Sequence, residues 1–229
     1  MDWSSGKSSI HPARGRIERT LALRHSGRTI RDMDWNARYL EQDTPWDKGT
    51  ATPVLDEIIA RHPEIFAGQQ VLVPGFGAGH DARWLAANGA MVTGHDIAPL
   101  AVVQARALDP GHTVTFAVGD FLNPSPDLDE AFNLLWEHTC FCALDPSLRP
   151  AYLEAAHQVL AAGGMVIGVF FINPEMDEGE TGPPFGIDAK KLEAHWKTAG
   201  FELVDSWVPA TGFDGRIGRE RAMFLKKQG

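Results

Sequence analysis

The sequence predicts an α/β fold built on a mostly parallel sheet, and three observations support this prediction. Short apolar runs typical of buried strands alternate with helix-like segments from about residue 51 onward. Turn-forming residues separate these segments, as at Asp109-Pro110-Gly111. The last two strand-like runs, 201–208 and 222–226, have no helix between them. The alternation implies parallel strands joined by right-handed crossovers, and the final pair implies an antiparallel edge.

Seven segments have the composition of strands, and about five have that of helices. The expected strands are 70–74, 91–96, 113–118, 132–136, 165–172, 201–208 and 222–226. The expected helices begin near Pro53 and then cover 80–88, 98–108, 147–161 and 188–198. The run 165–172 is almost wholly apolar, which is typical of a strand with helices on both faces of its sheet.

The first residues differ from the rest of the chain in composition. Residues 1–31 hold seven Lys or Arg and only two acidic residues, whereas the 229-residue chain has a formal net charge of -9. We interpret residues 1–34 as an N-terminal extension or lid. Residues 35–229 are long enough for one domain with a full hydrophobic core.

Charge, hydropathy and cysteine content exclude several classes of protein. An acidic balance disfavours nucleic-acid binding, which needs cations against phosphate. There is no apolar run of the ~18 residues that a membrane span requires. Cys140 and Cys142 are the only cysteines, and one residue between them is poor spacing for a disulfide or a structural zinc site. We therefore expect a cytoplasmic protein without a metal, either a monomer or a homodimer, whose partner is a small molecule.

The ends of the first three expected strands carry a candidate nucleoside site. Ligands of open α/β sheets bind beyond the carboxyl ends of the strands. Gly75, Gly77 and Gly79 follow the first strand, and without a Cβ their backbone can approach a ligand closely. Asp96 ends the second strand, where a carboxylate can accept hydrogen bonds from ribose hydroxyls. Asp120-Phe121 follows the third strand, where it can hold and cover an adenine base.

The spacing of the glycines distinguishes between two nucleotide-type ligands. A dinucleotide site needs G-x-G-x-x-G to bring a helix N-terminus against a pyrophosphate. Here the spacing is G-x-G-x-G, and His80 stands where the third glycine of that motif would be. S-adenosylmethionine has no phosphate, so the requirement disappears. The pattern favours an adenosylmethionine-dependent methyltransferase over a dehydrogenase.

Two stretches of this sequence resemble motifs of the thiopurine S-methyltransferase family. Residues 73–81, V-P-G-F-G-A-G-H-D, resemble its V-P-G-C-G-x-G-H-D motif. Residues 44–53, T-P-W-D-K-G-T-A-T-P, resemble the T-P-W-D-x-G-x-x-T-P segment of the thiol and halide methyltransferase branch. Phe76 departs from the cysteine that is usual in the turn, a change we expect to alter packing only.

The resemblance continues toward the C-terminus with the motifs in the family's order. Residues 141–150 resemble F-C-A-I-x-P-x-x-R-P, and residues 182–185 match G-P-P-[FY]. The similarity runs from roughly Trp35 to Lys226. It implies a class I methyltransferase (Rossmann-like) fold of seven strands, with S-adenosylmethionine as the cofactor.

The resemblance also implies site residues, position by position. The implied cofactor-binding residues are Trp35, Trp46, Gly75, Gly77, Gly79, Asp96, Ile97, Asp120, Phe121 and Glu137. The implied substrate-binding residues are His138, Thr139, Pro184 and Phe185. The two tryptophans would lie over the cofactor, and the last two residues would close the acceptor pocket.

His138 is the candidate catalytic residue. It stands where relatives commonly have tyrosine or arginine, next to the expected position of the transferring methyl group. A side chain with a reference pKa of about 6.5 can orient an acceptor or take its proton. Methyl transfer from a sulfonium is an in-line displacement, so the protein mainly aligns the reactants and excludes water.

Three functions are compatible with these residues. The leading one is methylation of a small soft nucleophile such as a thiol, hydrosulfide or halide, which needs little or no general base. An alternative is N-methylation of a small heteroaromatic or sulfur-containing amine, because the acidic loop 173–181 would suit a cationic acceptor. A third is a non-catalytic domain that binds adenosylmethionine.

Overall fold

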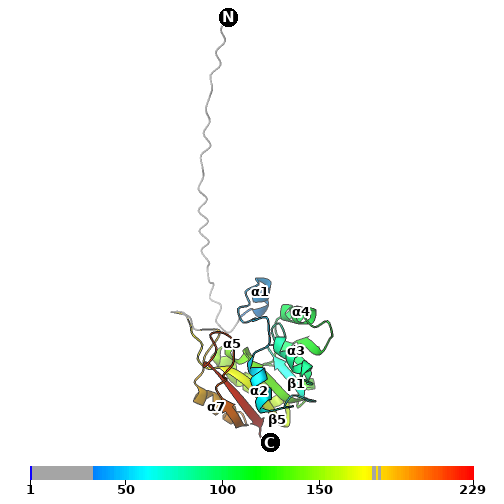
Figure 1. Cartoon of the computed structure of the whole chain (residues 1–229), viewed down its shortest axis with the longest axis vertical. Coiled ribbons are helices and arrows are strands. Elements are labelled where there is room, and N and C mark those ends of the chain that lie inside the picture. The colour runs from blue at the N-terminus through cyan, green and yellow to red at the C-terminus, as the bar shows by residue number, and fades with distance from the viewer. Residues whose placement is uncertain (2–32, 177–178, 180–181) are drawn as a thin grey trace.

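The computed structural model describes residue 1, residues 33–176, residue 179 and residues 182–229. Most of the predicted extension or lid over 1–34 lies outside these described residues, as do residues 177–178 and 180–181 of the acidic loop. The described chain forms a single seven-stranded sheet with helices on both of its faces (Figure 1).

All seven predicted strands are present. The strands are β1 (Gln70–Pro74), β2 (Met91–Asp96), β3 (Val114–Val118), β4 (Phe132–His138), β5 (Leu160–Phe171), β6 (Phe201–Trp207) and β7 (Glu220–Lys227). The α-helices are α1 (Trp35–Leu40), α2 (Val54–Arg61), α3 (His80–Ala87), α4 (Pro99–Ala107), α5 (Cys140–Ala143), α6 (Arg149–Val159) and α7 (Ala189–Thr198). The five longer helices were predicted, whereas the short helices α1 and α5 were not.

The strand order is β3-β2-β1-β4-β5-β7-β6. β1 pairs in parallel with β2 and β4, and β7 pairs antiparallel with both β5 and β6. The predicted mostly parallel sheet with an antiparallel edge is confirmed, and β7 inserts between β5 and β6. Because the order reverses between β1 and β4, a ligand site is expected at the carboxyl ends of these two strands.

Each face of the sheet carries its own apolar core. On one face α2, α3 and α4 contribute buried side chains such as Leu55, Ala82 and Ala101. On the other face α5, α6 and α7 contribute Phe141, Tyr152 and Trp196. This sandwich fixes the strand ends from both sides, so the loops that leave those ends have rigid supports.

The largest difference from a predicted boundary lies between α6 and β5. We expected a helix over 147–161 and a strand from Met165, but α6 ends at Val159 and β5 begins at Leu160. Leu160 already pairs with Phe132, and the pairing then resumes at Met165 after a bulge. Gly163 allows this bulge because its φ of +73° lies in the left-handed region.

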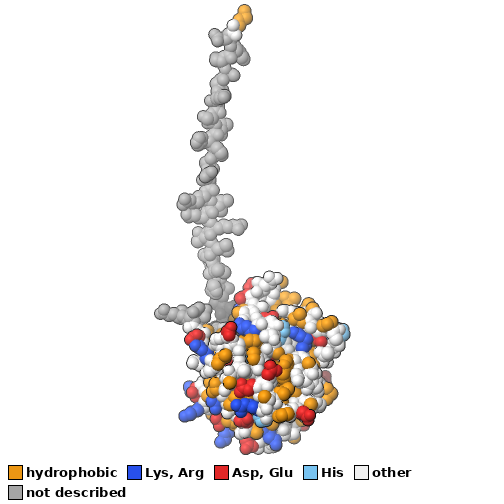
Figure 2. Space-filling model, in the orientation of Figure 1, with side chains coloured by type: hydrophobic (Ala, Val, Ile, Leu, Met, Phe, Trp, Pro, Cys, Tyr) orange, Lys and Arg blue, Asp and Glu red, His pale blue; other side chains and the backbone are white. Residues whose placement is uncertain are grey.

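Charged side chains of both signs are interspersed over the face of the domain shown in Figure 2. Among the helices that the structure describes, none is long and apolar enough to cross a membrane.

Candidate active site

A cavity of about 500 Å³ lies at the point where the strand order reverses. Its lining includes residues from four strand ends: Gly75 and Gly77 follow β1, Asp96 ends β2, Asp120 follows β3, and Thr139 follows β4. The volume is typical of a site for a small molecule or cofactor. The strand ends that the sequence selected therefore do meet at one cavity.

The turn after β1 brings the backbone against the cavity wall. Gly75 has a φ of +58°, and a Cβ there would lie 2.8 Å from Cys140 Sγ, so only glycine fits. Gly77 also lines the cavity, and its N–H donates to Asp96 Oδ2 at 3.0 Å. Gly79 is not among the described lining residues. A Cβ on Gly79 would lie 2.7 Å from the ring of Phe116, so this glycine serves the packing of α3 on the sheet.

Asp96 is held rigidly at the end of β2. Its carboxylate is buried and accepts hydrogen bonds from Gly77 N at 3.0 Å and Ala98 N at 2.9 Å. Burial raises the pKa of Asp96, while these two hydrogen bonds act in the opposite direction. Each carboxylate oxygen keeps a lone pair for a ligand hydroxyl. Ile97 follows in the cavity wall.

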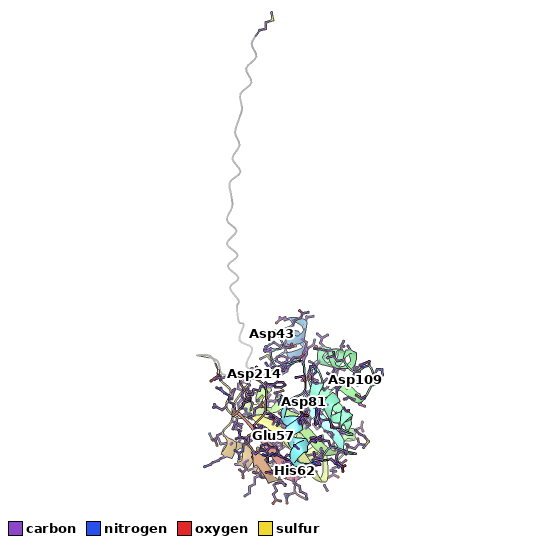
Figure 3. The ribbon with its side chains drawn as sticks, in the orientation of Figure 1. Asp43, Glu57, His62, Asp81, Asp109 and Asp214 are labelled. Carbon is purple, nitrogen blue, oxygen red and sulfur yellow. The ribbon has the colours of Figure 1, made fainter. Side chains whose placement is uncertain are left out.

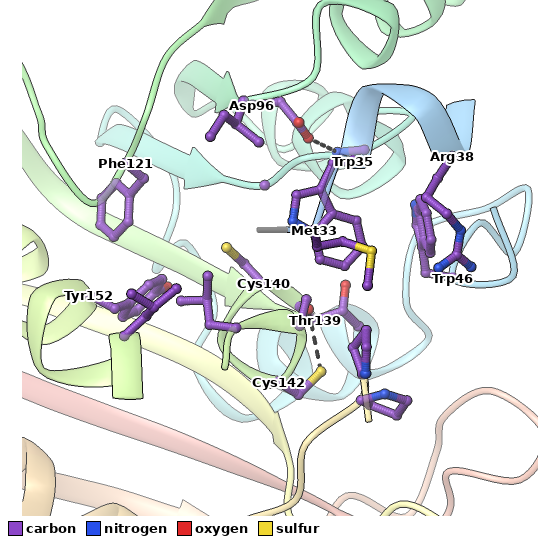
Figure 4. A pocket seen from close by; sticks show the side chains of 18 of the residues that line it. Met33, Trp35, Arg38, Trp46, Asp96, Phe121, Thr139, Cys140, Cys142 and Tyr152 are labelled. Atoms are coloured by element: carbon purple, nitrogen blue, oxygen red, sulfur yellow. Dashed lines mark hydrogen bonds between the residues drawn. The ribbon is translucent and has the colours of Figure 1, made fainter. Parts of the chain in front are cut away.

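Asp120 and Phe121 form the next part of the wall. The Asp120 carboxylate accepts hydrogen bonds from Leu122 N at 2.9 Å and Asn123 Nδ2 at 2.7 Å, which fixes its orientation. The Phe121 ring is buried and lies 4.8 Å from the ring of Tyr152. Figure 4 shows these two rings together at one side of the pocket. An aromatic floor beside a carboxylate suits a flat base that carries an amino group.

Aromatic side chains of α1 and the following loop cover the opposite side. Trp46 lies 5.5 Å from Trp35 and 5.8 Å from Tyr39, both in edge-on arrangements, and its Nε1–H donates to the Tyr39 hydroxyl at 3.3 Å. All three residues line the cavity, and Figure 4 shows the two tryptophans there. α1 is docked on α4 through Leu100 N, which donates to Asn36 Oδ1 at 2.9 Å. The two tryptophans thus line the cavity, and their predicted contact with the cofactor stays a prediction.

Glu137, His138 and Thr139 were predicted to lie in one site, but these three residues at the end of β4 have different surroundings. Among the described residues, the cavity lining includes Thr139 but neither Glu137 nor His138. Glu137 is buried on the face of the sheet that α5 and α6 cover. There it accepts hydrogen bonds from Phe141 N at 2.8 Å and from the Tyr152 hydroxyl. Burial raises the pKa of Glu137 to about 7. Glu137 thus supports the wall from behind.

His138 points to the other side of the sheet and forms a buried ion pair. Its Nδ1 lies 2.8 Å from Asp81 Oδ2. Asp81 also accepts hydrogen bonds from Thr52 N at 2.8 Å and Trp136 Nε1 at 3.0 Å. Burial favours the neutral forms, but the mutual attraction is stronger: the pKa of Asp81 is lowered and that of His138 is raised. Figure 3 places Asp81 toward the centre of the domain.

The loop before α7 contributes Pro184 to the cavity but not Phe185. Phe185 is buried instead, with its N–H donating to Cys142 O at 2.6 Å. Its carbonyl oxygen accepts a hydrogen bond from the Arg149 guanidinium at 2.7 Å. Phe185 therefore fixes the loop that presents Pro184, and the pocket role predicted for Phe185 stays a prediction.

The family is settled by comparison with known proteins. The family model described as thiopurine S-methyltransferase matches residues 30–215. This chain belongs to the thiopurine S-methyltransferase family. As the sequence predicted, it is an S-adenosylmethionine-dependent methyltransferase with a class I fold.

Individual relatives agree with this assignment. The chain is 29% identical to "Probable thiol methyltransferase 2" of Arabidopsis thaliana, over 98% of this chain and 96% of that protein. It is 27% identical to thiocyanate methyltransferase 1 of the same plant, over 87% of each chain. Among solved structures, a Burkholderia thailandensis N1-methyltransferase with bound S-adenosylhomocysteine superposes with a TM-score of 0.65 at 20% identity. That likeness covers 84% of this chain and 85% of the other, and it shows the fold alone.

The methyltransferase site also contains residues that sequence reasoning missed. They are Tyr39, Cys140, Cys142, Tyr152 and Arg216. The two cysteines were considered as candidates for a disulfide or a zinc site, although their position just after β4 signals a cavity wall. Burial raises the pKa of Cys142 to about 12, and it raises that of Cys140 well above its ordinary value. Both thiols therefore stay neutral.

The donor set of the described residues does not suggest a metal. No group of three or more His, Cys, Asp or Glu side chains in that part of the chain could hold a metal ion. The polar groups of the cavity instead suit an organic ligand.

Proposed function

We propose that this methyltransferase transfers the methyl group of S-adenosylmethionine to a small soft nucleophile, such as a thiol, hydrosulfide, thiocyanate or halide. The observation that carries the proposal is the distribution of charge along the cavity. Asp96 and Asp120 line the cavity at the ends of β2 and β3. Arg216, from the loop before β7, lines it from the opposite half of the sheet, beyond β1 and β4. The lining also holds Asp145 and Arg38, which pairs with Asp43. The two aspartates at the ends of β2 and β3 suit a nucleoside, and Arg216 suits an anion.

The residues at the β2–β3 end of the cavity fit the cofactor. Gly75 and Gly77 leave room beside the backbone that a Cβ would fill, and Asp96 presents lone pairs to a pair of hydroxyls. Asp120 and Phe121 suit an adenine base. Bound S-adenosylmethionine supplies a methyl group on a positively charged sulfur, which is already a good leaving group. Aromatic faces such as those of Trp35 and Trp46 favour such a cation.

The second end suits an anionic or polarizable acceptor. Arg216 Nη1 pairs with Glu220 Oε1 at 3.1 Å, but a guanidinium has five N–H donors, so others are left for a ligand. An acceptor that arrives as an anion needs no general base. The neutral thiols of Cys140 and Cys142 do not compete as nucleophiles. The protein therefore has to orient the acceptor, attract it and exclude water.

The alternative of a cationic amine acceptor draws less support from the geometry. Its main motivation is the acidic loop 173–181. The described carboxylate of that loop, Glu175, is exposed and pairs with Arg219 rather than lining the cavity. The relatives' names also point to sulfur acceptors, because they are called thiol, thiocyanate and thiopurine methyltransferases.

An acceptor screen tests the proposal directly. The protein is incubated with S-adenosylmethionine labelled in its methyl group and with hydrosulfide, thiocyanate, iodide, an aromatic thiol or imidazole in separate reactions. We expect labelled product from the sulfur or halide acceptors and not from imidazole. Product from imidazole alone would favour N-methylation. Tight cofactor binding without product from any acceptor would favour the silent binding domain.

A further inference from the structure

We infer that His138 is a positioning residue that holds Glu220, and through Glu220 the Arg216 guanidinium, at the acceptor end of the cavity. This inference rests on the proposed function, because it names the group that controls acceptor binding at that same site. His138 does not touch the acceptor in this arrangement. It acts from behind the cavity wall.

Four charged side chains form a chain of close contacts inside the fold. His138 Nδ1 lies 2.8 Å from Asp81 Oδ2, and His138 Nε2 lies 3.9 Å from Glu220 Oε1. Glu220 Oε1 in turn lies 3.1 Å from Arg216 Nη1. Asp81 belongs to α3, His138 to β4, Glu220 to β7 and Arg216 to the loop before β7. We call these four residues the buried charge cluster.

The cluster is shielded from water, so its charges interact strongly. The exposed fractions of the His138, Glu220 and Arg216 side chains are 8%, 2% and 12%. Within the described part of the chain, His138 Nε2 and Glu220 Oε2 are both buried without a hydrogen-bond partner. A buried carboxylate needs compensating charge. Glu220 has two sources of it, the Arg216 guanidinium and the His138 imidazolium.

His138 also supports the loop that carries Arg216. The ring of Phe213, from that loop, stacks on the imidazole with centroids 6.1 Å apart and an interplanar angle of 24°. The Arg216 guanidinium lies 6.0 Å from the Phe213 ring centroid. His138 therefore contacts the loop through an aromatic ring and attracts its anchor, Glu220, through charge.

The protonation state of His138 depends on groups from every side. Asp81 from α3 and Glu220 from β7 favour the imidazolium, whereas Arg216 opposes it. Glu137 is the neighbouring carboxyl on β4. Burial lowers the pKa of His138, but the carboxylates outweigh it and raise the pKa above its ordinary value. When His138 loses its proton, Glu220 keeps only Arg216 as a counter-charge and draws it away from the acceptor.

Two variants separate this role from direct proton transfer. His138→Gln removes the charge, and His138→Arg restores a cation that does not titrate. Iodide serves as the acceptor because its charge does not change with pH. We expect the glutamine variant to raise the KM for iodide about tenfold while kcat changes less than about twofold. The arginine variant keeps a low KM that is flat from pH 6 to pH 9, whereas wild-type KM rises with pH.

Measurements without turnover keep the inference separate from the proposed function. Calorimetry measures iodide binding to the S-adenosylhomocysteine complex, and NMR measures the titration of the His138 imidazole in wild type and in Glu220→Gln. We expect weaker iodide binding in His138→Gln and a lower His138 pKa in Glu220→Gln. Unchanged values in both experiments would overturn the inference. If both values change as expected but no sulfur or halide acceptor is methylated, the proposed function alone would be overturned.

Discussion

Gly75 approaches Cys140 so closely that a methyl group does not fit between them. A Cβ on residue 75 would lie 2.8 Å from Cys140 Sγ and 3.0 Å from Cys140 Cβ, on a backbone with a φ of +58°. We expect Gly75→Ala to lower the free energy of unfolding by about 1–3 kcal/mol, through backbone strain and overpacking. Denaturant unfolding measures this loss, and calorimetry with S-adenosylhomocysteine measures the accompanying loss of cofactor affinity.

A second substitution at Cys140 provides the control for that prediction. Cys140→Ala removes the sulfur but leaves the strained φ and the Cβ contact. The double variant Gly75→Ala/Cys140→Ala should therefore recover part of the stability, with a coupling of about 0.5–3 kcal/mol between the two sites. Strictly additive losses would show that the clash with Cys140 is not what Gly75 avoids.

Arg216 and Arg219 lie on the same loop but serve different purposes. Arg216 lines the cavity, whereas Arg219 pairs with the exposed Glu175. We expect Arg216→Gln to raise the KM for thiocyanate or iodide by about tenfold or more, since a charge-assisted contact is lost. The affinity for S-adenosylhomocysteine should stay the same. Steady-state kinetics check this, with Arg219→Gln as the matched control. Equal effects of the two variants would argue against an acceptor role for Arg216.

The residues at the end of β4 show why single-residue roles were hard to predict. Successive side chains of a strand point to opposite faces of the sheet. Glu137 therefore lies beneath α5, His138 lies against Asp81 of α3, and only Thr139, beyond the strand, reaches the cavity. The sequence predicted this strand, although β4 continues to His138 rather than ending at residue 136. It did not show which of three adjacent residues faces the ligand.

At the scale of elements, α1 depends on its contacts. It has six residues and none of them is buried, and a helix this short is unstable in isolation. Asn36 ties it to α4 by accepting a hydrogen bond from Leu100 N. We expect Asn36→Ala to speed amide hydrogen exchange over residues 35–40 and to raise the off-rate of the cofactor. Exchange mass spectrometry with and without S-adenosylhomocysteine measures this, and ligand should slow exchange there in wild type. Amide hydrogen exchange that changes neither on ligand binding nor in Asn36→Ala would contradict the role of α1 as a cover over the cavity.

The elements that the sequence predicted well are those with a strong local signal. β1, β2 and α3 have apolar periodicity and clear turn residues at their ends, and they lie within a residue of the expected bounds. α1 and α5 lack such a signal because they are too short to show a period. The early start of β5 depends on pairing between Leu160 and Phe132, a contact between segments distant in sequence. Arg216 was missed because it lies in an irregular loop.

At the scale of the whole molecule, Asp81 joins parts of the fold that are far apart in sequence. Its carboxylate binds Thr52 N from the N-terminal segment, and it binds Trp136 and His138 of β4. Asp81 itself lies in the first turn of α3, next to the glycine-rich turn. One buried ion pair and its hydrogen bonds thus join α3, β4 and the N-terminal segment. Loss of that pair should affect global stability rather than one loop.

The Asp81–His138 pair gives stability a defined pH dependence. The pKa of His138 is raised in the fold, so its contribution is complete below the unfolded value of about 6.5 and is lost as pH rises through the folded pKa. The pKa of Asp81 is lowered, so its contribution is complete above about 3.9 and is lost as pH falls through the folded pKa. The pair therefore stabilises the protein most between about pH 4 and pH 6.5.

Asp81→Asn should lower the free energy of unfolding by about 3–5 kcal/mol near pH 6, because it leaves the buried His138 without its partner. The difference from wild type should shrink as the pH rises through the folded pKa of His138. Denaturant unfolding from pH 5 to pH 9 measures both effects. Asp43→Asn is the matched control, since Asp43 pairs with Arg38 at the surface and its loss should cost at most about 1 kcal/mol. Figure 3 shows the two aspartates in these contrasting places. A pH-independent difference between wild type and Asp81→Asn would mean that His138 is neutral in the folded protein.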